Sequence, residues 1–189
     1  HPITTTEPFY DDTSFAKATT EIAAPLLEEF DADHVLFSYH GLPESQIRKG
    51  ESKQGWCLKA DDSCCDTIRN ENRYCYRAQC FATTRRLVEE LGLPSGTYST
   101  TFQSRLAGQR WIGPYTDHAL AALREQGVER LAVLTPSFVS DCLETLEEIG
   151  VRLREQWESM GGEDLLLVPC VNSNPTWATG LADLVRQSV

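Results

Sequence analysis

"HVLFSYHG", residues 34–41, is a short apolar run of strand-forming residues that closes on a glycine, with Pro43 two positions later. Such a run, bounded by turn residues, is typical of a strand buried on both faces of a parallel sheet. A helix-like stretch at about 13–30 precedes it. Downstream, "AQCFATTRRLVEELG" (78–92) predicts a helix that ends at Gly92, and "GTYSTTFQ" (96–103) predicts a second strand.

The same alternation of strands and helices runs to the end of the chain. The pattern predicts a helix near 116–126, a strand at 130–136, a helix from Asp141 to about Ser159, a strand at 164–169 and a closing helix from about Pro175. Strand–helix units in succession predict an α/β fold, a Rossmann-like parallel sheet of about four strands flanked by helices. Ligands bind such sheets beyond the carboxyl ends of the strands, so chemistry is expected there.

Length and charge narrow the classes of function. The 189 residues, 41% of them hydrophobic, suit a single α/β domain over residues 1–189. The 28 acidic and 17 basic residues give a net charge of −11, which argues against a nucleic-acid partner because the field of the protein repels phosphate. No apolar run reaches the ~20 residues of a membrane span, and the first residues carry no secretory signal, so we expect a soluble protein.

The first strand ends in "LFSYHGLPE" (36–44), where His40 is the last residue before a Gly-Leu-Pro turn. A histidine at a strand end is more often a hydrogen-bonded structural residue than a catalytic one. Its imidazole can nevertheless accept a proton or bind a transition metal near neutral pH. Position and residue type leave both interpretations of His40 open.

The third strand runs into "PSFVSDCLETLEEI" (136–149), an acidic helix start. Asp141 followed by Glu144 fits a capping box, which would be structural. Glu144 and Glu148 are four residues apart on one helix face, where like charges repel unless a cation or protons intervene. Two carboxylates and the His40 imidazole in one crevice would suit a divalent first-row metal or a set of proton acceptors.

Three motifs together resemble ferrochelatase, which inserts ferrous iron into a porphyrin in haem biosynthesis: "LFSYHGLPE", "TFQSRLAGQRWIGPYTD" (101–117) and "SDCLETLEEI" (140–149). The resemblance implies that His40 is the catalytic histidine and Glu144 the essential acidic residue. Together with Glu148 they would hold the Fe²⁺ substrate. At Cys142 some relatives carry a histidine, while others resemble this chain. The resemblance also places four residues at the porphyrin cleft: Tyr39, Trp111, Pro114 and Tyr115.

Ferrochelatases consist of two similar α/β halves with the porphyrin between them, and this chain resembles the second half. We therefore expect either a fragment that begins inside the "PFY" segment (8–10) or a chain that needs a separate partner. The expected partners are porphyrin, ferrous iron and the N-terminal half. The resemblance implies a cytoplasmic location and protoporphyrin IX or coproporphyrin III as the porphyrin; membrane contact does not follow from the sequence.

"WCLKADDSCCDTIRNENRYCYRAQC" (56–80) carries five of the seven cysteines: Cys57, Cys64, Cys65, Cys75 and Cys80. An odd number cannot all pair as disulfides, and a bridge between neighbours would be strained. Thiols in a reducing compartment also stay free. Four thiolates can hold zinc or an iron–sulfur cluster, but the paired C-x-x-C motifs of many zinc sites are absent.

This segment is an insertion at about 51–80 and resembles one that carries a [2Fe–2S] cluster in some bacterial ferrochelatases. The resemblance implies that four of the five cysteines bind the cluster: Cys57, Cys75 and Cys80, with Cys64 or Cys65 as the fourth. Zinc, disulfides and free thiols stay as alternatives. Two other functions also stay open, a non-catalytic iron–sulfur sensor on a chelatase fold and a chelatase for another tetrapyrrole or metal, such as cobalt.

Overall fold

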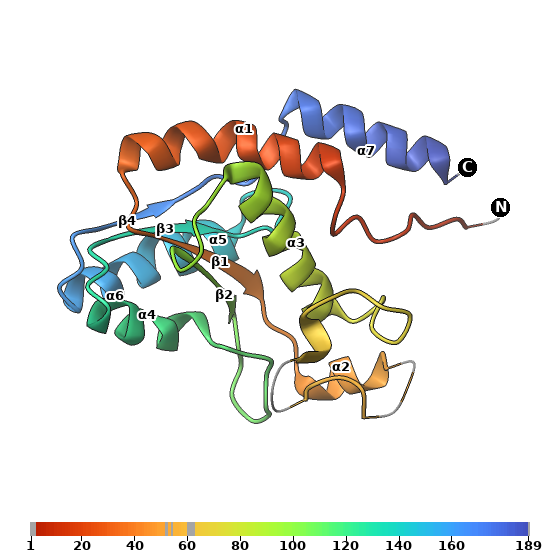
Figure 1. Ribbon diagram of the computed structural model, residues 1–189, viewed down its shortest axis with the longest axis horizontal. Coiled ribbons are helices and arrows are strands. Elements are labelled where there is room, and N and C mark those ends of the chain that lie inside the picture. The colour runs from red at the N-terminus through yellow and green to blue at the C-terminus, as the bar shows by residue number, and fades with distance from the viewer. Residues whose placement is uncertain (1–2, 52, 54, 60–62, 189) are drawn as a thin grey trace.

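A computed structural model describes residues 3–51, 53, 55–59 and 63–188. Its sheet has four strands in the order β2-β1-β3-β4, and every pair is parallel. The strands are β1 (His34–His40), β2 (Tyr98–Gln103), β3 (Arg130–Leu134) and β4 (Asp164–Leu167). The predicted α/β fold with a four-stranded parallel sheet is confirmed (Figure 1).

The strand register brings the functional motifs to one edge of the sheet. His40 is paired with Gln103 across β1 and β2, and Phe37 is paired with Leu134 across β1 and β3. Because all strands run the same way, their carboxyl ends meet at this edge. The segments that follow β1, β2 and β3 therefore surround one region.

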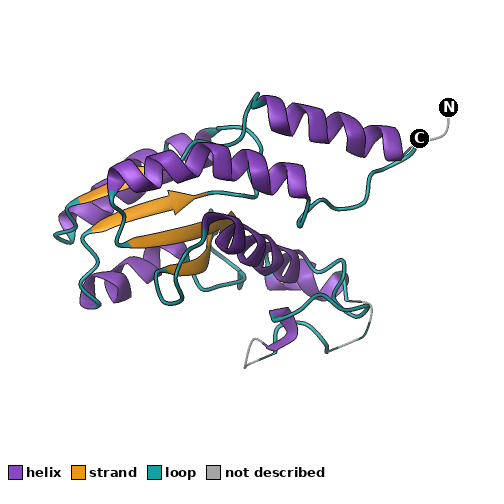
Figure 2. Cartoon of the chain, turned by 45° about the horizontal axis from the view of Figure 1, so that its top comes forward, coloured by secondary structure: helices purple, strands orange, loops and turns teal. Residues whose placement is uncertain are grey.

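Helices cover both faces of the sheet (Figure 2). Alternate residues of β1 explain this, since Phe37 faces a core shared with α1 and α3, whereas Leu36 faces a core shared with α4 and α6. A strand with apolar side chains on both faces needs cover on both. The helices are α1 (Thr13–Phe30), α3 (Tyr76–Leu91), α4 (Thr116–Glu125), α6 (Arg154–Ser159) and α7 (Pro175–Gln187), the last packed on α1.

Local signals set the helix ends. The Asp12 side chain accepts the Phe15 N–H at 2.9 Å and begins α1. Gly92 has φ 63° and ends α3, a left-handed conformation that glycine adopts without steric cost. Asn174 caps α7, whose first residue is Pro175, as predicted.

The predicted continuous helix from Asp141 to Ser159 is wrong. The segment forms α5 (Leu143–Leu146), a π-helix η2 (Glu148–Leu153) and then α6. The Glu147 carbonyl accepts from both Val151 N and Arg152 N, at 3.2 and 3.0 Å, so the helix gains one residue in this turn. A 3.6-residue periodicity does not reveal this, and π-turns are frequent at functional sites.

The predicted capping box of Asp141 and Glu144 is also wrong. Cys142 is the N-cap of α5, and its N–H donates to Thr145 Oγ1 at 3.0 Å. The Asp141 carboxylate instead accepts from Cys170 N and Asn172 Nδ2, at 2.9 and 2.7 Å. Asp141, which the capping motif assigned to the start of its own helix, therefore ties the segment after β4 to the carboxyl edge of the sheet.

The cysteine-rich segment lies beside the first turns of α3. It follows α2 (Glu44–Lys49) and contains the short helix η1 (Ser63–Cys65). In Figure 1 this segment occupies one end of the molecule, away from α4 and α6. In the part of the chain that the structure describes, no helix combines the length and apolar character that a membrane crossing requires.

Candidate functional site

His40 ends β1 with one ring nitrogen occupied and the other available. Its Nδ1 lies 2.6 Å from the Gly41 carbonyl oxygen. A carbonyl only accepts, so Nδ1 carries the proton, and Nε2 of the neutral ring keeps its lone pair. That nitrogen can accept a proton or bind a metal ion. The ring lies between those of Trp111 and Phe138, with centroids 6.5 and 6.1 Å away.

The turn after His40 is closely packed. A Cβ at Gly41 would lie 2.9 Å from the Gln103 carbonyl oxygen and 3.3 Å from the Trp111 ring. Gly41 N donates to that same carbonyl at 2.8 Å. Glycine is therefore needed here for close approach of two strand ends rather than for an unusual backbone angle.

A cavity of about 500 Å³ opens beside His40. Its wall brings together the ends of β1 and β2 and the segment from α5 into η2, and it is lined by His40, Ser104, Arg105, Leu106, Trp111, Leu143, Glu144, Glu147, Glu148 and Arg152. A second cavity of about 580 Å³ shares six of these residues, from Ser104 to Arg152, and extends toward Tyr115 and Gln156. The predicted convergence of His40, Glu144 and Glu148 on one crevice is what the structure has.

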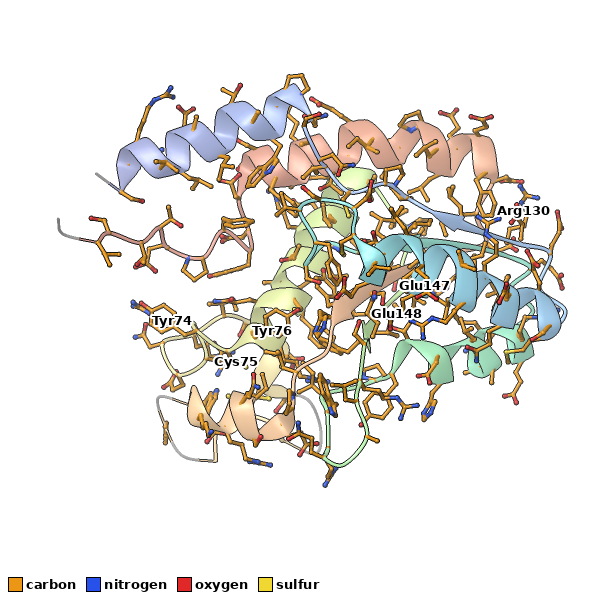
Figure 3. All side chains as sticks on the ribbon, turned by 180° about the vertical axis from the view of Figure 1, so that it is seen from behind. Tyr74, Cys75, Tyr76, Arg130, Glu147 and Glu148 are labelled. Carbon is orange, nitrogen blue, oxygen red and sulfur yellow. The ribbon has the colours of Figure 1, made fainter. Side chains whose placement is uncertain are left out.

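The Glu148 carboxylate holds the residue that follows β2. Its two oxygens accept from Ser104 N at 2.7 Å and Ser104 Oγ at 2.6 Å. Ser104 has φ 63°, a conformation that non-glycine residues seldom adopt. Glu148 thus both lines the cavity and holds the end of β2, and Figure 3 shows it at the start of the π-helix, next to Glu147.

Glu144 is a charged residue of the cavity lining. A hydrogen bond from the Cys142 thiol, its own backbone N–H and the nearby His40 together lower the pKa of its carboxyl. Gln103 Nε2 donates to the Glu144 carbonyl oxygen at 2.6 Å and so ties α5 to β2. The neighbouring Glu147 pairs with Arg152 at 2.8 Å, which offsets one of the three negative charges here.

The three predicted iron ligands do not form a finished coordination site. Within the described ranges, no three His, Cys, Asp or Glu side chains surround a point where a single metal ion could sit. His40, Glu144 and Glu148 therefore share a cavity wall without the close spacing of a storage site. The arrangement offers one nitrogen base and carboxylate oxygens to something that enters the cavity.

Only two of the four predicted cleft residues line either cavity. Trp111 lines both cavities and Tyr115 the second, whereas exposed Pro114 lines neither. The prediction that Tyr39 lies at the cleft is wrong. Tyr39 is 1% exposed in the core, and its hydroxyl is hydrogen-bonded to Thr84 Oγ1 of α3 at 2.9 Å. Successive side chains of a strand point to opposite faces, so Tyr39 and His40 cannot both face the cavity.

Sequence reasoning missed the polar residues that support the site. Buried Gln103 accepts from Ser38 Oγ at 2.8 Å while it holds α5, and Ser137 Oγ accepts from His40 N at 3.0 Å. A buried glutamine at a strand end, in "TFQSR", was the available signal for Gln103. No local pattern marks Ser137, because its partner is 97 residues away.

The five cysteines of the inserted segment form one buried group, here called the thiol cluster: Cys57, Cys64, Cys65, Cys75 and Cys80, each 3–6% exposed. The Sγ atoms of Cys64 and Cys65 lie 3.8 Å apart, and Cys75 lies close enough to Cys57 to raise the pKa of its thiol. Every one is a free thiol. The other two cysteines lie elsewhere, Cys142 at the start of α5 and Cys170 beside Thr135.

Burial raises the pKa of three of these thiols, those of Cys57, Cys65 and Cys80. The pKa values of Cys57 and Cys65 rise to about 12, with desolvation the largest cause in each case. Neighbouring thiols raise the pKa of Cys65 further, whereas the Arg77 guanidinium lowers it. Without metal, Cys57 and Cys65 therefore hold their protons at neutral pH, and metal binding there must displace them.

These thiols should make the metal-free chain sensitive to alkali. The pKa values of Cys57 and Cys65 in the folded chain exceed the ordinary thiol value of about 9, so their contribution to stability is complete below about pH 9 and is lost as the pH rises toward 12. We expect the free energy of unfolding, measured by urea titration, to fall across this window by up to about 1.4 kcal/mol per pH unit for each such thiol. A metal-loaded chain, whose thiolates are already deprotonated, should show a shallower fall; equal slopes would contradict the account.

The family model for ferrochelatase matches residues 1–189, the whole of this chain. This chain belongs to the ferrochelatase family. The resemblance seen in the three motifs is thereby confirmed.

Three ferrochelatases illustrate the relationship. That of Pseudomonas fluorescens SBW25 is 46% identical over 182 residues, or 96% of this chain and 53% of the relative. Those of Azotobacter vinelandii DJ and Bdellovibrio bacteriovorus HD100 are each 46% identical, over 95% and 94% of this chain and 53% and 52% of the relative. The chain thus spans about half the length of the ferrochelatases it matches.

Among solved structures, the putative cobalamin biosynthesis protein CbiX of Marinobacter aquaeolei VT8 is similar to this ferrochelatase-family chain. The TM-score is 0.44 and the identity 17%, over 82% of this chain and 94% of that one.

Removing the Glu148 charge should loosen this ferrochelatase-family site. Glu148→Gln weakens two charge-assisted hydrogen bonds to Ser104, so we expect a loss of about 1–3 kcal/mol in the free energy of unfolding. The segment after β2 should also be cleaved faster by trypsin at Arg105. The exposed Glu158→Gln is the matched control, expected within about 0.5 kcal/mol of the parent. Equal proteolysis of both variants would contradict the bracing role.

Proposed function

We propose that the protein to which this chain belongs inserts Fe²⁺ into a porphyrin. The observation that carries the proposal is the available Nε2 of His40 in one cavity with Glu144 and Glu148, in a member of the ferrochelatase family. The cavity lies beyond the carboxyl ends of parallel strands, where such sheets bind ligands.

The donor set suits the reaction. Metal insertion removes two protons from pyrrole nitrogens and exchanges the ligands around Fe²⁺ for four ring nitrogens. His40 Nε2 supplies a base, and the carboxylates of Glu144 and Glu148 supply temporary oxygen ligands and a field that attracts the ion. Substrate iron must leave the protein for the ring, so an incomplete ligand set fits better than a closed one.

We also propose that the N-terminal half of the family completes the porphyrin cleft. Two exposed leucines line the cavity, Leu106 at 70% and Leu143 at 74%, and two more exposed apolar side chains belong to the segment from α5 into η2, Leu146 at 55% and Val151 at 48%. An apolar rim of this kind suits contact with a flat macrocycle and with a second half. The relatives are about twice as long as this chain, which supports the same proposal.

The direct test is loss of porphyrin fluorescence on adding Fe²⁺ without oxygen. The 189-residue chain is assayed alone and with the first half of the Pseudomonas fluorescens ferrochelatase, using protoporphyrin IX and coproporphyrin III in parallel. Metallation by either preparation supports the proposal, and the preferred porphyrin identifies the substrate. Metallation with Co²⁺ but not Fe²⁺, or none when both halves are present, would contradict it.

We propose further that the thiol cluster holds a [2Fe–2S] cluster. Such a cluster needs four thiolates, and five lie close together: Cys75 lies near Cys57, the Sγ atoms of Cys64 and Cys65 are 3.8 Å apart, and Cys80 lies near Cys75 and Cys65. The proposed ligands are Cys57, Cys75 and Cys80, with Cys64 or Cys65 as the fourth. Thiolates are also the ligands that iron–sulfur clusters require. The residues therefore fit the group in kind and in proximity, whereas no set of three described ligands surrounds a single ion. A cytoplasmic location, where thiols stay reduced, is part of this proposal.

Loss of one ligand should release the cluster. Cys75 is 6% exposed at the start of α3, so Cys75→Ser should lower iron and acid-labile sulfide per chain by at least about tenfold and expose the inserted segment to protease. Cys142→Ser is the matched control, because serine can cap α5 and the residue lies outside the thiol cluster. Zinc without sulfide in the purified parent would favour the zinc alternative.

A further inference from the structure

Tyr76, in the first turn of α3, contacts both the thiol cluster and the end of β1. Its hydroxyl donates to the His40 carbonyl oxygen at 2.8 Å. The same hydroxyl is close enough to the Cys80 thiol and to Ser137 for each to shift the pKa of Tyr76, and Ser137 Oγ accepts the His40 N–H. Both backbone groups of His40 are thus held by atoms at or next to the Tyr76 hydroxyl. In Figure 3 Tyr76 lies nearer the sheet than Tyr74, which points outward.

Arg77, the next residue, makes a second connection. It is 3% exposed, and its Nη1 donates to Cys65 Sγ at 3.2 Å. Its Nε and Nη2 donate to the Gly113 carbonyl oxygen at 3.1 and 2.9 Å. Gly113 lies between Trp111 and Tyr115, which line the cavities. A planar guanidinium has its donors in fixed directions, so it fixes the thiol and this loop relative to each other.

We propose that Tyr76 and Arg77 are positioning residues that make the placement of His40 and of the 111–115 loop depend on whether the thiol cluster holds a metal group. This inference rests on the proposed function, since it assumes that the thiol cluster binds metal and that His40 acts on the porphyrin.

The protons of the Tyr76 hydroxyl and the Cys80 thiol decide how metal binding would act on the end of β1. The Tyr76 hydroxyl has one proton, which it donates to the His40 carbonyl, while the Cys80 thiol, one helical turn along α3, carries a proton of its own. A metal-bound thiolate has no proton and is a strong acceptor, so sulfur then competes with the carbonyl for the Tyr76 proton. Loading should shift the end of β1 through Tyr76. It should also strengthen the Arg77 contact with Cys65 and hold Gly113 more firmly.

The test uses the 189-residue chain and needs no catalysis. Its four histidines are labelled with ¹⁵N, and the His40 ring signals are identified by their absence in His40→Ala. One equivalent of Zn²⁺ is then added under reducing conditions. We expect the His40 signals to move in the parent and in Tyr74→Phe, an exposed tyrosine two residues away. They should stay within the line width in Tyr76→Phe, which lacks only the hydroxyl.

Each outcome of this titration decides the coupling. Movement that persists in Tyr76→Phe, or no movement in the parent, would overturn it. Cys75→Ser tests for direct binding of Zn²⁺ to His40. A shift of the His40 signals in that variant would mean that the ion acts without the thiol cluster, and it would also overturn the coupling.

The Arg77 connection has its own readout. Amide exchange of residues 111–115 should slow at least about threefold when Zn²⁺ is added to the parent and to Arg73→Lys. Arg77→Lys keeps the positive charge but loses the paired N–H donors of the guanidinium, so amide exchange of residues 111–115 in this variant should not respond to Zn²⁺. Arg73 is the matched control because it is exposed and contacts neighbouring Tyr74. An equal response in Arg77→Lys would remove Arg77 from the proposal.

Kinetics separate this inference from the proposed function. In the preparation that metallates porphyrin, Tyr76→Phe should lower kcat about tenfold with little change in KM, because His40 is misplaced after porphyrin binds. Arg77→Lys should mainly raise the KM for porphyrin, because it loosens the loop that carries Trp111. If no preparation metallates porphyrin, the proposed function fails while the NMR result stands. If metallation occurs and the His40 signals do not respond, only the coupling fails.

Discussion

His40→Ala should lower the rate of porphyrin metallation by about 10²–10⁴-fold, the range that loss of a general base produces. The variant loses the nitrogen that the Gly41 hydrogen bond leaves available. The fold should persist, because the ring's hydrogen bond is to the adjacent residue and the β1 backbone keeps its partners in β2 and β3. The measurement is the initial rate of fluorescence loss with Fe²⁺ in the absence of oxygen.

His118→Ala is the matched control for His40. His118 is exposed on α4, lines neither cavity and contacts Arg105, so its loss should change the rate less than about twofold. Added imidazole should restore part of the activity of His40→Ala, since the substitution leaves space for the missing base. If His40→Ala keeps more than a tenth of the parent rate, His40 is not the base.

Glu144→Gln should lower metallation by about 10²-fold or more, because it removes a negative charge and an oxygen ligand while keeping the shape of the side chain. The thiol of Cys142, the backbone N–H and His40 lower the pKa of this carboxyl, so it is charged throughout the pH range in which Fe²⁺ stays soluble. The effect should include a higher KM for Fe²⁺ and a weaker dependence of the rate on salt.

Two further variants serve as controls for Glu144→Gln. Glu144→Asp keeps the charge and should retain more activity than Glu144→Gln. Glu158→Gln removes an equivalent charge from the far end of α6 and should leave the rate within about twofold. A Glu144→Gln enzyme with the Fe²⁺ dependence of the parent would mean that iron enters along Glu148, the other carboxylate of the pair.

These variants also separate the alternatives. A non-catalytic iron–sulfur sensor predicts cluster loading without metallation in any preparation, and equal behaviour of His40→Ala and the parent. A chelatase for another metal predicts that Co²⁺ replaces Fe²⁺ as the preferred ion. Membership of the ferrochelatase family and the cavity that joins His40 to Glu144 favour iron insertion over both.

Features with local causes were predictable from the sequence. The apolar run at 34–41 specifies a strand covered on both faces, Gly92 ends α3 in a left-handed conformation, and Asn174 with Pro175 begins α7. Each depends on residues a few positions apart, so the sequence contains the whole cause. The alternation of such units then implies a parallel sheet and places His40 and the acidic motif at its carboxyl edge.

Features with distant causes were not predictable from the sequence. The π-turn at Glu148 is associated with a hydrogen bond to Ser104, 44 residues away, and the contact between Tyr76 and His40 spans 36 residues. Tyr39 was assigned to the cleft because it adjoins His40 in the motif, yet strand geometry turns it toward α3. The sequence by itself determined the fold class and the candidate site residues at the carboxyl edge of the sheet. Only the tertiary structure decided which of them meet, because hydrogen bonds between distant segments depend on how whole elements pack.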